Sequence, residues 1–180
     1  MIEEIVKYNH KFVANCGYIP YEAEKYPRKK LAILACMDTR LVELLPAALG
    51  LKNGDVKMIK NAGGMVLDPY DTTIRSLLVA VLELNVREIM VIAHTDCGVK
   101  GMKPGTIEEH LEERGVTREA IHRFLEGGHG LSFWFKGFSS PEASVRKSLK
   151  ILRNHPLMPA DIVIDGFVMD VHTGKLNPVL

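Results

Sequence analysis

The sequence has few cysteines, no long apolar run and almost no net charge. Three cysteines among 180 residues are too few for the disulfide framework that stabilises small secreted domains. No apolar run approaches the ~20 residues that a membrane-spanning helix needs. The 23 Lys and Arg residues nearly balance the 22 Asp and Glu residues, which gives a net charge of +1. With no dense basic run to neutralise phosphates, we expect neither a nucleic-acid partner nor a membrane.

The composition is that of a folded domain. Hydrophobic residues make up 47% and charged residues 25% of the chain, close to globular averages, so a disordered or fibrous protein is excluded. No repeat or low-complexity linker marks a boundary, so we predict one domain over residues 1–180. The N-terminal letters MIEEIVKYNHKF place acidic residues where a secretory signal has basic ones. We therefore expect a cytoplasmic protein.

Residues 1–30 are predicted to form an N-terminal helix and an extension. Apolar side chains at helical spacing predict an amphipathic helix over residues 2–15; they are Ile2, Ile5, Val6, Phe12 and Val13. Residues 18–30 contain two prolines and three tyrosines without a period, which indicates an irregular connection. This apolar surface can pack on its own chain or on a second subunit, and the residues alone favour neither.

The rest of the chain alternates between strand and helix patterns. The predicted strands are Leu31–Cys36, Asp55–Lys60, Arg87–Ala93 and Asp161–Asp170, followed by a short final strand after the turn at Thr173 and Gly174. One predicted helix spans residues 41–50, with Pro46 at its start or at a kink, and a second spans residues 73–85 and is capped by Asp71 or Thr72. Three more helices are predicted to begin at Thr106, in a capping box with Glu109, at Thr117 and at Pro141. This order predicts an α/β fold in which helices flank a mostly parallel sheet.

Chemically reactive side chains follow two of these strands. The letters CMDTR (36–40) close the first strand, and HTDCG (94–98) closes the third. Ligands in such folds bind beyond the carboxyl ends of the strands. If the extended conformation continues past the first strand, Cys36, Asp38 and Arg40 point to the same side, because side chains alternate along a strand.

Cys36, His94 and Cys97 form a candidate metal-binding set. Two thiolates and one imidazole suit tetrahedral Zn²⁺ better than ions that prefer oxygen ligands. Three protein ligands leave the fourth position open, as in a catalytic zinc site, and Asp38 is the nearby residue that could close it. Asp38 and Arg40 could instead form a surface ion pair at the start of the next helix, but that interpretation leaves the cysteines unexplained.

Three other features have weaker interpretations. Cys16 has no second ligand near it in sequence, so we predict a small buried side chain. His129, in the letters GGHG, is a candidate flexible proton carrier. The letters NAGG (61–64) do not fit a dinucleotide-binding pattern, so their glycines more simply permit a close backbone approach to the pocket.

In combination these motifs resemble the β-class carbonic anhydrases, particularly the short bacterial and archaeal type. CMDTR (36–40), NAG (61–63) and HTDCG (94–98) occur in the family's order, and the letters DVHTGKL (170–176) match its D-x-x-T-G-x-L ending. The resemblance extends over residues 31–180. It implies a zinc enzyme that reversibly hydrates carbon dioxide to bicarbonate and a proton by means of zinc-bound hydroxide, and that works as a homodimer or higher homo-oligomer.

The resemblance also implies roles for individual residues. Cys36, His94 and Cys97 would hold zinc, and Asp38 with Arg40 would form an acid–base dyad. In some members of the class the aspartate binds zinc directly, and the site stays closed until the arginine draws the carboxylate away. The sequence does not distinguish the open form of the site from the closed form.

Asn61, Ala62 and Gly63 are expected to line a small substrate pocket. Thr39 stands where the family more often has serine; it keeps the hydroxyl and adds a methyl group. Two alternatives stay open beside hydration. The same ligand set could hydrolyse a linear analogue such as carbonyl sulfide or carbon disulfide, or Asp38 could close the site permanently in a non-catalytic zinc protein.

Overall fold

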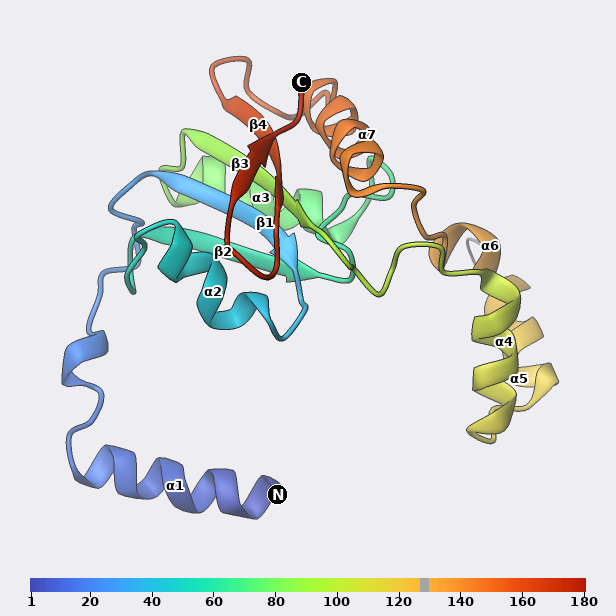
Figure 1. The fold of residues 1–180 in the computed structure, drawn as a ribbon, viewed down its shortest axis with the longest axis horizontal. Helices are drawn as coiled ribbons and strands as arrows, with labels where there is room; N and C mark the ends of the chain where they lie inside the picture. The colour runs from blue at the N-terminus through green and yellow to red at the C-terminus, as the bar shows by residue number, and fades with distance from the viewer. Residues whose placement is uncertain (127–129) are drawn as a thin grey trace.

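The computed structural model of the chain describes residues 1–126 and 130–180. These residues form a five-stranded sheet in the order β2-β1-β3-β4-β5 (Figure 1). The strands are β1 (Leu31–Cys36), β2 (Val56–Asn61), β3 (Glu88–His94), β4 (Val163–Met169) and β5 (Leu176–Pro178). β1 to β4 pair in parallel, and β5 runs antiparallel to β4. The mostly parallel sheet predicted from the sequence is confirmed.

Helices cover both faces of the sheet and extend beyond it. Their bounds are α1 (Ile2–Ala14), α2 (Leu41–Ala48), α3 (Thr72–Glu83), α4 (Pro104–Glu113), α5 (Arg118–Glu126), α6 (Leu131–Trp134) and α7 (Pro141–Arg153), with a short 3₁₀ turn, η1, at Ile19–Tyr21. None of the described helices is both long enough and apolar enough to cross a membrane.

The apolar letters LAILAC make β1 a strand that is buried on both faces. Ala32 and Leu34 pack in one cluster with residues of α3 and α7, whereas Ile33 and Ala35 pack in a second cluster with residues of α2. The chain therefore crosses from β1 to β2 over one face and from β2 to β3 over the other. The direction of winding changes between β1 and β3, and in open α/β sheets a ligand crevice lies at that point.

Three helix ends are marked by local features, of which the Asp71 cap was predicted. The Asp71 carboxylate accepts a hydrogen bond from the Thr73 backbone N–H at 2.8 Å and caps α3. The Ser140 hydroxyl oxygen accepts one from the Ala143 N–H at 3.1 Å and caps α7. Gly50 ends the segment after α2 with a φ of 63°, a conformation that glycine adopts without a steric penalty.

One helix prediction was wrong in detail. The capping box at Thr106 does not form, because α4 already begins at Pro104, whose fixed φ suits the first helical position, and Lys103 makes no side-chain cap. The four-residue helix α6 was not predicted. Pro46 lies inside α2, the second of the two positions expected for it.

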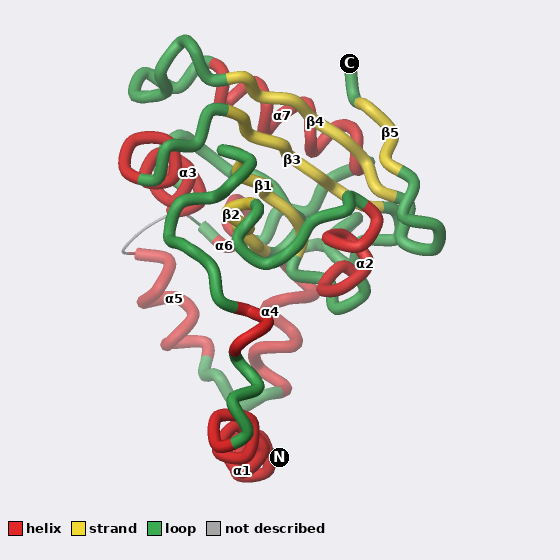
Figure 2. The backbone as a smooth tube through the Cα atoms, turned by 90° about the vertical axis from the view of Figure 1, so that its left-hand side faces the viewer, coloured by secondary structure: helices red, strands yellow, loops and turns green. Residues whose placement is uncertain are grey.

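The N-terminal helix α1 lies apart from the sheet, and α4 and α5 extend from the other side of the sheet in Figure 1; in Figure 2 all three helices lie below the sheet. No residue of α1 is buried against the described part of the chain. Its apolar residues Ile2, Ile5 and Val13 are each more than half exposed. The extension rejoins the body at Arg28, whose backbone N–H donates to the Gly54 carbonyl at 3.0 Å and whose side chain pairs with Asp55 at 2.9 Å.

Candidate metal centre

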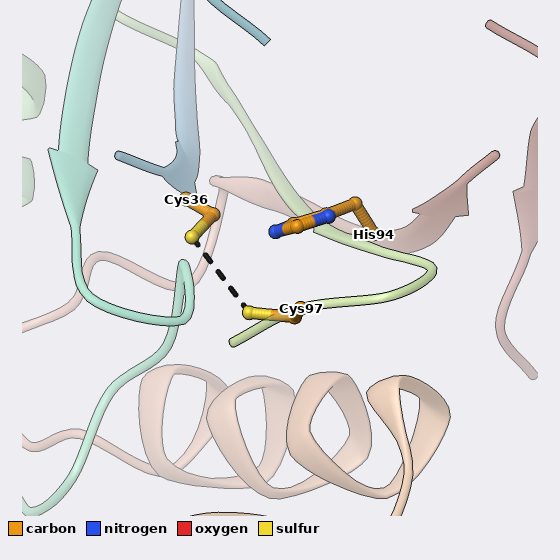
Figure 3. A group of neighbouring side chains, drawn as sticks. All are labelled: Cys36, His94 and Cys97. Atoms are coloured by element: carbon orange, nitrogen blue, oxygen red, sulfur yellow. Dashed lines mark hydrogen bonds between the residues drawn. The ribbon is translucent and has the colours of Figure 1, made fainter. Parts of the chain in front are cut away.

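Cys36, His94 and Cys97 come together where β1 and β3 end, the switch point of the sheet (Figure 3). One ligand atom from each residue lies within 4.8 Å of the other two, and the two sulfur atoms are 3.9 Å apart. All three side chains are buried. The structure thus assembles the three side chains that the sequence predicts as metal ligands.

The histidine is oriented for a metal ion. His94 Nδ1 lies 2.8 Å from the Thr95 carbonyl oxygen, an acceptor, so Nδ1 carries the proton and Nε2 presents its lone pair. Nε2 is fully buried and has no hydrogen-bond partner among residues 1–126 and 130–180. A buried acceptor without a partner costs free energy, and a metal ion between this nitrogen and the two sulfur atoms would remove that cost. The residues present therefore fit a metal ion.

The two thiols differ in acidity. Burial acts to raise the pKa of the Cys36 thiol, but the neighbouring His94 imidazole and the backbone N–H groups of Asp38 and Gly63 outweigh it and lower that pKa to about 7. Burial raises the pKa of Cys97 to about 11, and the neighbouring Cys36 sulfur adds to this effect. For His94, burial acts to lower the pKa, but the neighbouring Cys36 sulfur outweighs it and the net shift is upward. Two adjacent thiolates repel each other, so a thiophilic cation is what allows both to ionise.

The turn after β2 holds its shape through Asn61. The Asn61 amide nitrogen donates to the Met65 carbonyl at 2.7 Å and to the Thr73 hydroxyl at 2.9 Å, and its oxygen accepts from the Met65 N–H at 3.0 Å. Gly64 has a φ of 59°, and a Cβ placed there would lie 2.6 Å from the backbone nitrogen of Cys36. The backbone of this turn therefore lies close to β1, as the glycines of residues 61–64 predict, and only glycine fits at Gly64.

The other two pocket residues face different partners. The Gly63 backbone N–H donates to Cys36 Sγ at 3.4 Å, so it serves the metal-binding thiol. Ala62 lines a cavity of about 290 Å³ together with residues that include Val99 and Trp134. The structure places Asn61, Ala62 and Gly63 beside the candidate ligands, with the Asn61 side chain committed to the turn.

Asp38 and Arg40 meet, but not by continuing the strand. β1 ends at Cys36, and Arg40 has helical backbone angles, so the alternation argument was wrong about the route. Instead the chain turns: the Arg40 backbone N–H donates to Asp38 Oδ1 at 2.9 Å, and Nε and Nη2 of the guanidinium bind Oδ1 and Oδ2 at 2.9 and 2.8 Å. Arg40 holds the pKa of Asp38 well below its usual range, mainly through these hydrogen bonds. Asp38 Oδ2 is 3.9 Å from His94 Nε2, at the edge of the ligand cluster.

The sequence argument missed the role of Asp96. Its carboxylate accepts a hydrogen bond from Arg40 Nη1 at 2.7 Å, and its backbone carbonyl accepts one from Nη2 at 2.8 Å. Asp96 belongs to HTDCG, but nothing in that spacing indicates a contact with a residue at the end of another strand. Its one usable signal is its residue type, because aspartate tolerates the left-handed φ of 52° found here.

Two minor expectations have different outcomes. Cys16 is exposed, so the prediction of a buried side chain was wrong. It follows α1, in which no residue is buried. His129 lies outside the described residues.

Comparisons with known proteins identify the family. The sequence profile of the carbonic anhydrases matches residues 31–176, which include both ligand segments. A β-carbonic anhydrase of Trichomonas vaginalis superposes with a TM-score of 0.90 at 30% identity, covering 100% of this chain and 97% of that one. The chain belongs to the β-carbonic anhydrase family. A carbonic anhydrase of Streptococcus mutans has a TM-score of 0.78 and 34% identity, over 99% and 97% of the two chains.

The β-carbonic anhydrase chain also has a relative named for another reaction. It is 30% identical over 159 residues to a carbon disulfide hydrolase of Acidithiobacillus thiooxidans, covering 83% of this chain and 77% of that protein. The sequence therefore resembles enzymes named for two linear substrates.

Proposed function

We propose that the chain catalyses the reversible hydration of carbon dioxide to bicarbonate and a proton, with zinc as its cofactor. One observation carries the proposal. A buried Cys36, His94 and Cys97 cluster, whose histidine nitrogen lacks a partner among the described residues, lies beside a carboxylate that Arg40 keeps ionised.

The ligand set supports zinc over harder cations. Two sulfur ligands and one imidazole favour Zn²⁺ over Mg²⁺ or Ca²⁺, and three protein ligands leave a coordination position for a substrate or water. When bound, such an ion lowers the pKa of a coordinated water to about 7 and so supplies a nucleophile at neutral pH.

The chain's own residues orient the reactants. Asp38 stays ionised and so acts only as a hydrogen-bond acceptor, with Oδ2 directed toward the ligand cluster at 3.9 Å from His94 Nε2. It is placed to accept a hydrogen bond from the attacking water and to fix that water's orientation. Arg40 keeps the carboxylate in this position. Asn61 holds the turn that carries Ala62 and Gly63, and the Gly63 N–H of that turn contacts Cys36 Sγ.

The proposal includes an assembly and a location. We propose one domain over residues 1–180 that forms a homodimer or higher homo-oligomer, because α1 presents an apolar face that the described part of its own chain leaves uncovered. The free thiols of the candidate site favour the reducing cytoplasm over an oxidising compartment.

A second candidate function is hydrolysis of carbon disulfide or carbonyl sulfide. The likeness to a named carbon disulfide hydrolase favours it, and the ligand set would be the same. A non-catalytic protein closed by Asp38 is the third outcome, since Oδ2 already lies near the ligand atoms.

One experiment separates the three. Zinc content and stopped-flow hydration are measured on the same preparation from about pH 7 to about pH 9, with the three linear substrates compared side by side. We expect carbon dioxide hydration that rises with pH at one zinc per chain. Preference for a sulfur substrate would support the hydrolase, and full zinc with no turnover would support the closed protein.

A further inference from the structure

Arg40 contacts two carboxylates through different N–H groups. The Asp38 carboxylate accepts hydrogen bonds from Nε and Nη2 of Arg40. The Asp96 carboxylate accepts a hydrogen bond from Nη1, and the Asp96 backbone carbonyl accepts one from Nη2. The two aspartates therefore do not compete for the same donors. An arginine held on two sides has a fixed plane, whereas one held on a single side can swing about its long side chain.

The backbone of Asp96 is shaped for this contact. Asp96 lies between His94 and Cys97 in the loop after β3, with a φ of 52°. In this conformation both its side chain and its carbonyl oxygen reach the guanidinium. Aspartate, asparagine and glycine are the residues that adopt such angles most readily, so asparagine can replace Asp96 without distorting the loop.

We propose that Asp96 is a positioning residue: it anchors the Arg40 guanidinium so that Arg40 holds Asp38 in its working orientation. This inference rests on the proposed function. An anchor matters here because the Arg40 side chain is 38% exposed and would otherwise lose order to solvent.

Losing the anchor has a definite consequence for Asp38. Its Oδ2 lies 3.9 Å from His94 Nε2, so the same carboxylate is close enough to bind a metal held by His94 after a small rotation. With Arg40 loosened, Asp38 would spend more time on the metal. The negative charge of Asp96 acts in the opposite sense by repelling Asp38, but Asp96 is 75% exposed, so solvent and salt screen that repulsion. The directional hydrogen bonds should outweigh it.

The test compares Asp96→Asn with a matched control in the full-length, cobalt(II)-loaded protein. The control is Asp161→Asn, which removes the carboxylate of another exposed aspartate–arginine pair, Asp161 with Arg87 at 3.1 Å. X-ray absorption and the visible spectrum report the share of metal with a carboxylate ligand. We expect Asp96→Asn to raise the ratio of carboxylate-bound to open metal sites about two- to fivefold, and to lower kcat/KM for carbon dioxide in proportion to the open fraction that is lost. Asp161→Asn should change neither quantity.

Other outcomes would overturn the inference. A spectrum unchanged by Asp96→Asn, or a smaller carboxylate share, would contradict it. In an Arg40→Ala background, Asp96→Asn should have no further effect, so an additional loss there would show that Asp96 does not act through Arg40. If Asp96→Asn fails to fold, Asp96→Gly replaces it. Loss of cobalt from the folded Asp96 variant would show that Asp96 shapes the ligand loop instead. If the wild-type protein holds cobalt but hydrates no carbon dioxide, the proposed function fails while the spectra still decide the role of Asp96.

Discussion

At the scale of single residues, the protein contains thiols with contrasting surroundings. Cys36 is buried beside His94 and Gly63, whereas Cys16 is exposed after α1. Changing Cys36 to serine should abolish stoichiometric zinc and hydration, because a neutral hydroxyl is a poor ligand for zinc in place of a thiolate. Changing Cys16 to serine should leave both intact. Elemental analysis of the folded variants measures this, and one tightly held zinc per chain in Cys36→Ser would contradict the ligand assignment.

Asp38 should make stability depend on pH in a defined direction. Its pKa is depressed in the folded protein by Arg40, so the stabilisation is present above the unfolded value of about 4 and is lost as pH falls through the lower folded pKa. Because Arg40 is over a third exposed, we expect less than about 1 kcal/mol. Urea unfolding of metal-free wild type and Asp38→Asn from about pH 6 to about pH 3 measures the difference. If the difference in unfolding free energy between wild type and Asp38→Asn grew toward acid pH, this linkage would be refuted.

The sequence predicted the ligands and the pair of Asp38 with Arg40 because each lies in a short motif at a strand end. It could not predict Asp96 as the second partner of Arg40, since that contact depends on how two loops from different strands turn. The same dependence on loop conformation explains why the sequence argument wrongly extended the strand from Cys36 to Arg40. Strand periodicity does not apply beyond Cys36, where the chain turns back through a hydrogen bond from the Arg40 backbone to Asp38.

At the scale of elements, α7 lies unusually close to β4 at Gly166. A Cβ at this position would lie 2.3 Å from Val145 Cγ1 and 2.8 Å from Leu149 Cδ1. Gly166→Ala should therefore force the helix away from the strand and cost about 1–3 kcal/mol of unfolding free energy. Gly105→Ala is the control, because no described atom lies within 4 Å of a Cβ there. Equal urea midpoints for the two variants would show that α7 shifts without cost.

Strands were easier to predict than the helices between β3 and β4. A buried parallel strand is a short apolar run, and β1 has the predicted bounds, while β2 and β3 are each shifted by one residue from the prediction. The segment from α4 to α6 extends beyond the sheet, so the sheet imposes little pattern on it (Figure 1). There the fixed φ of Pro104 set the helix start in preference to the cap at Thr106.

At the scale of the whole molecule, the uncovered face of α1 predicts self-association. Ile5 and Val6 are exposed and are not part of the described core. If the proposed homodimer forms through α1, replacing both with glutamate should dissociate it and leave the circular dichroism of the folded chain unchanged. Replacing Lys11, in the last turn of α1, should leave the proposed dimer intact. Sedimentation velocity measures the state, and a double variant that stays dimeric would place the interface elsewhere.

The separation of the ligands along the chain bears on how the protein is made. Cys36 and Cys97 are 61 positions apart, so the metal centre closes a long loop and depends on pairing of β1 with β3. Such non-local contacts form late in folding. In refolding with cobalt(II), the thiolate absorption should therefore appear with the slowest phase rather than before it. During synthesis, Cys36 emerges from the ribosome well before His94 and Cys97, and until β3 follows it is a solvent-accessible thiol open to oxidation.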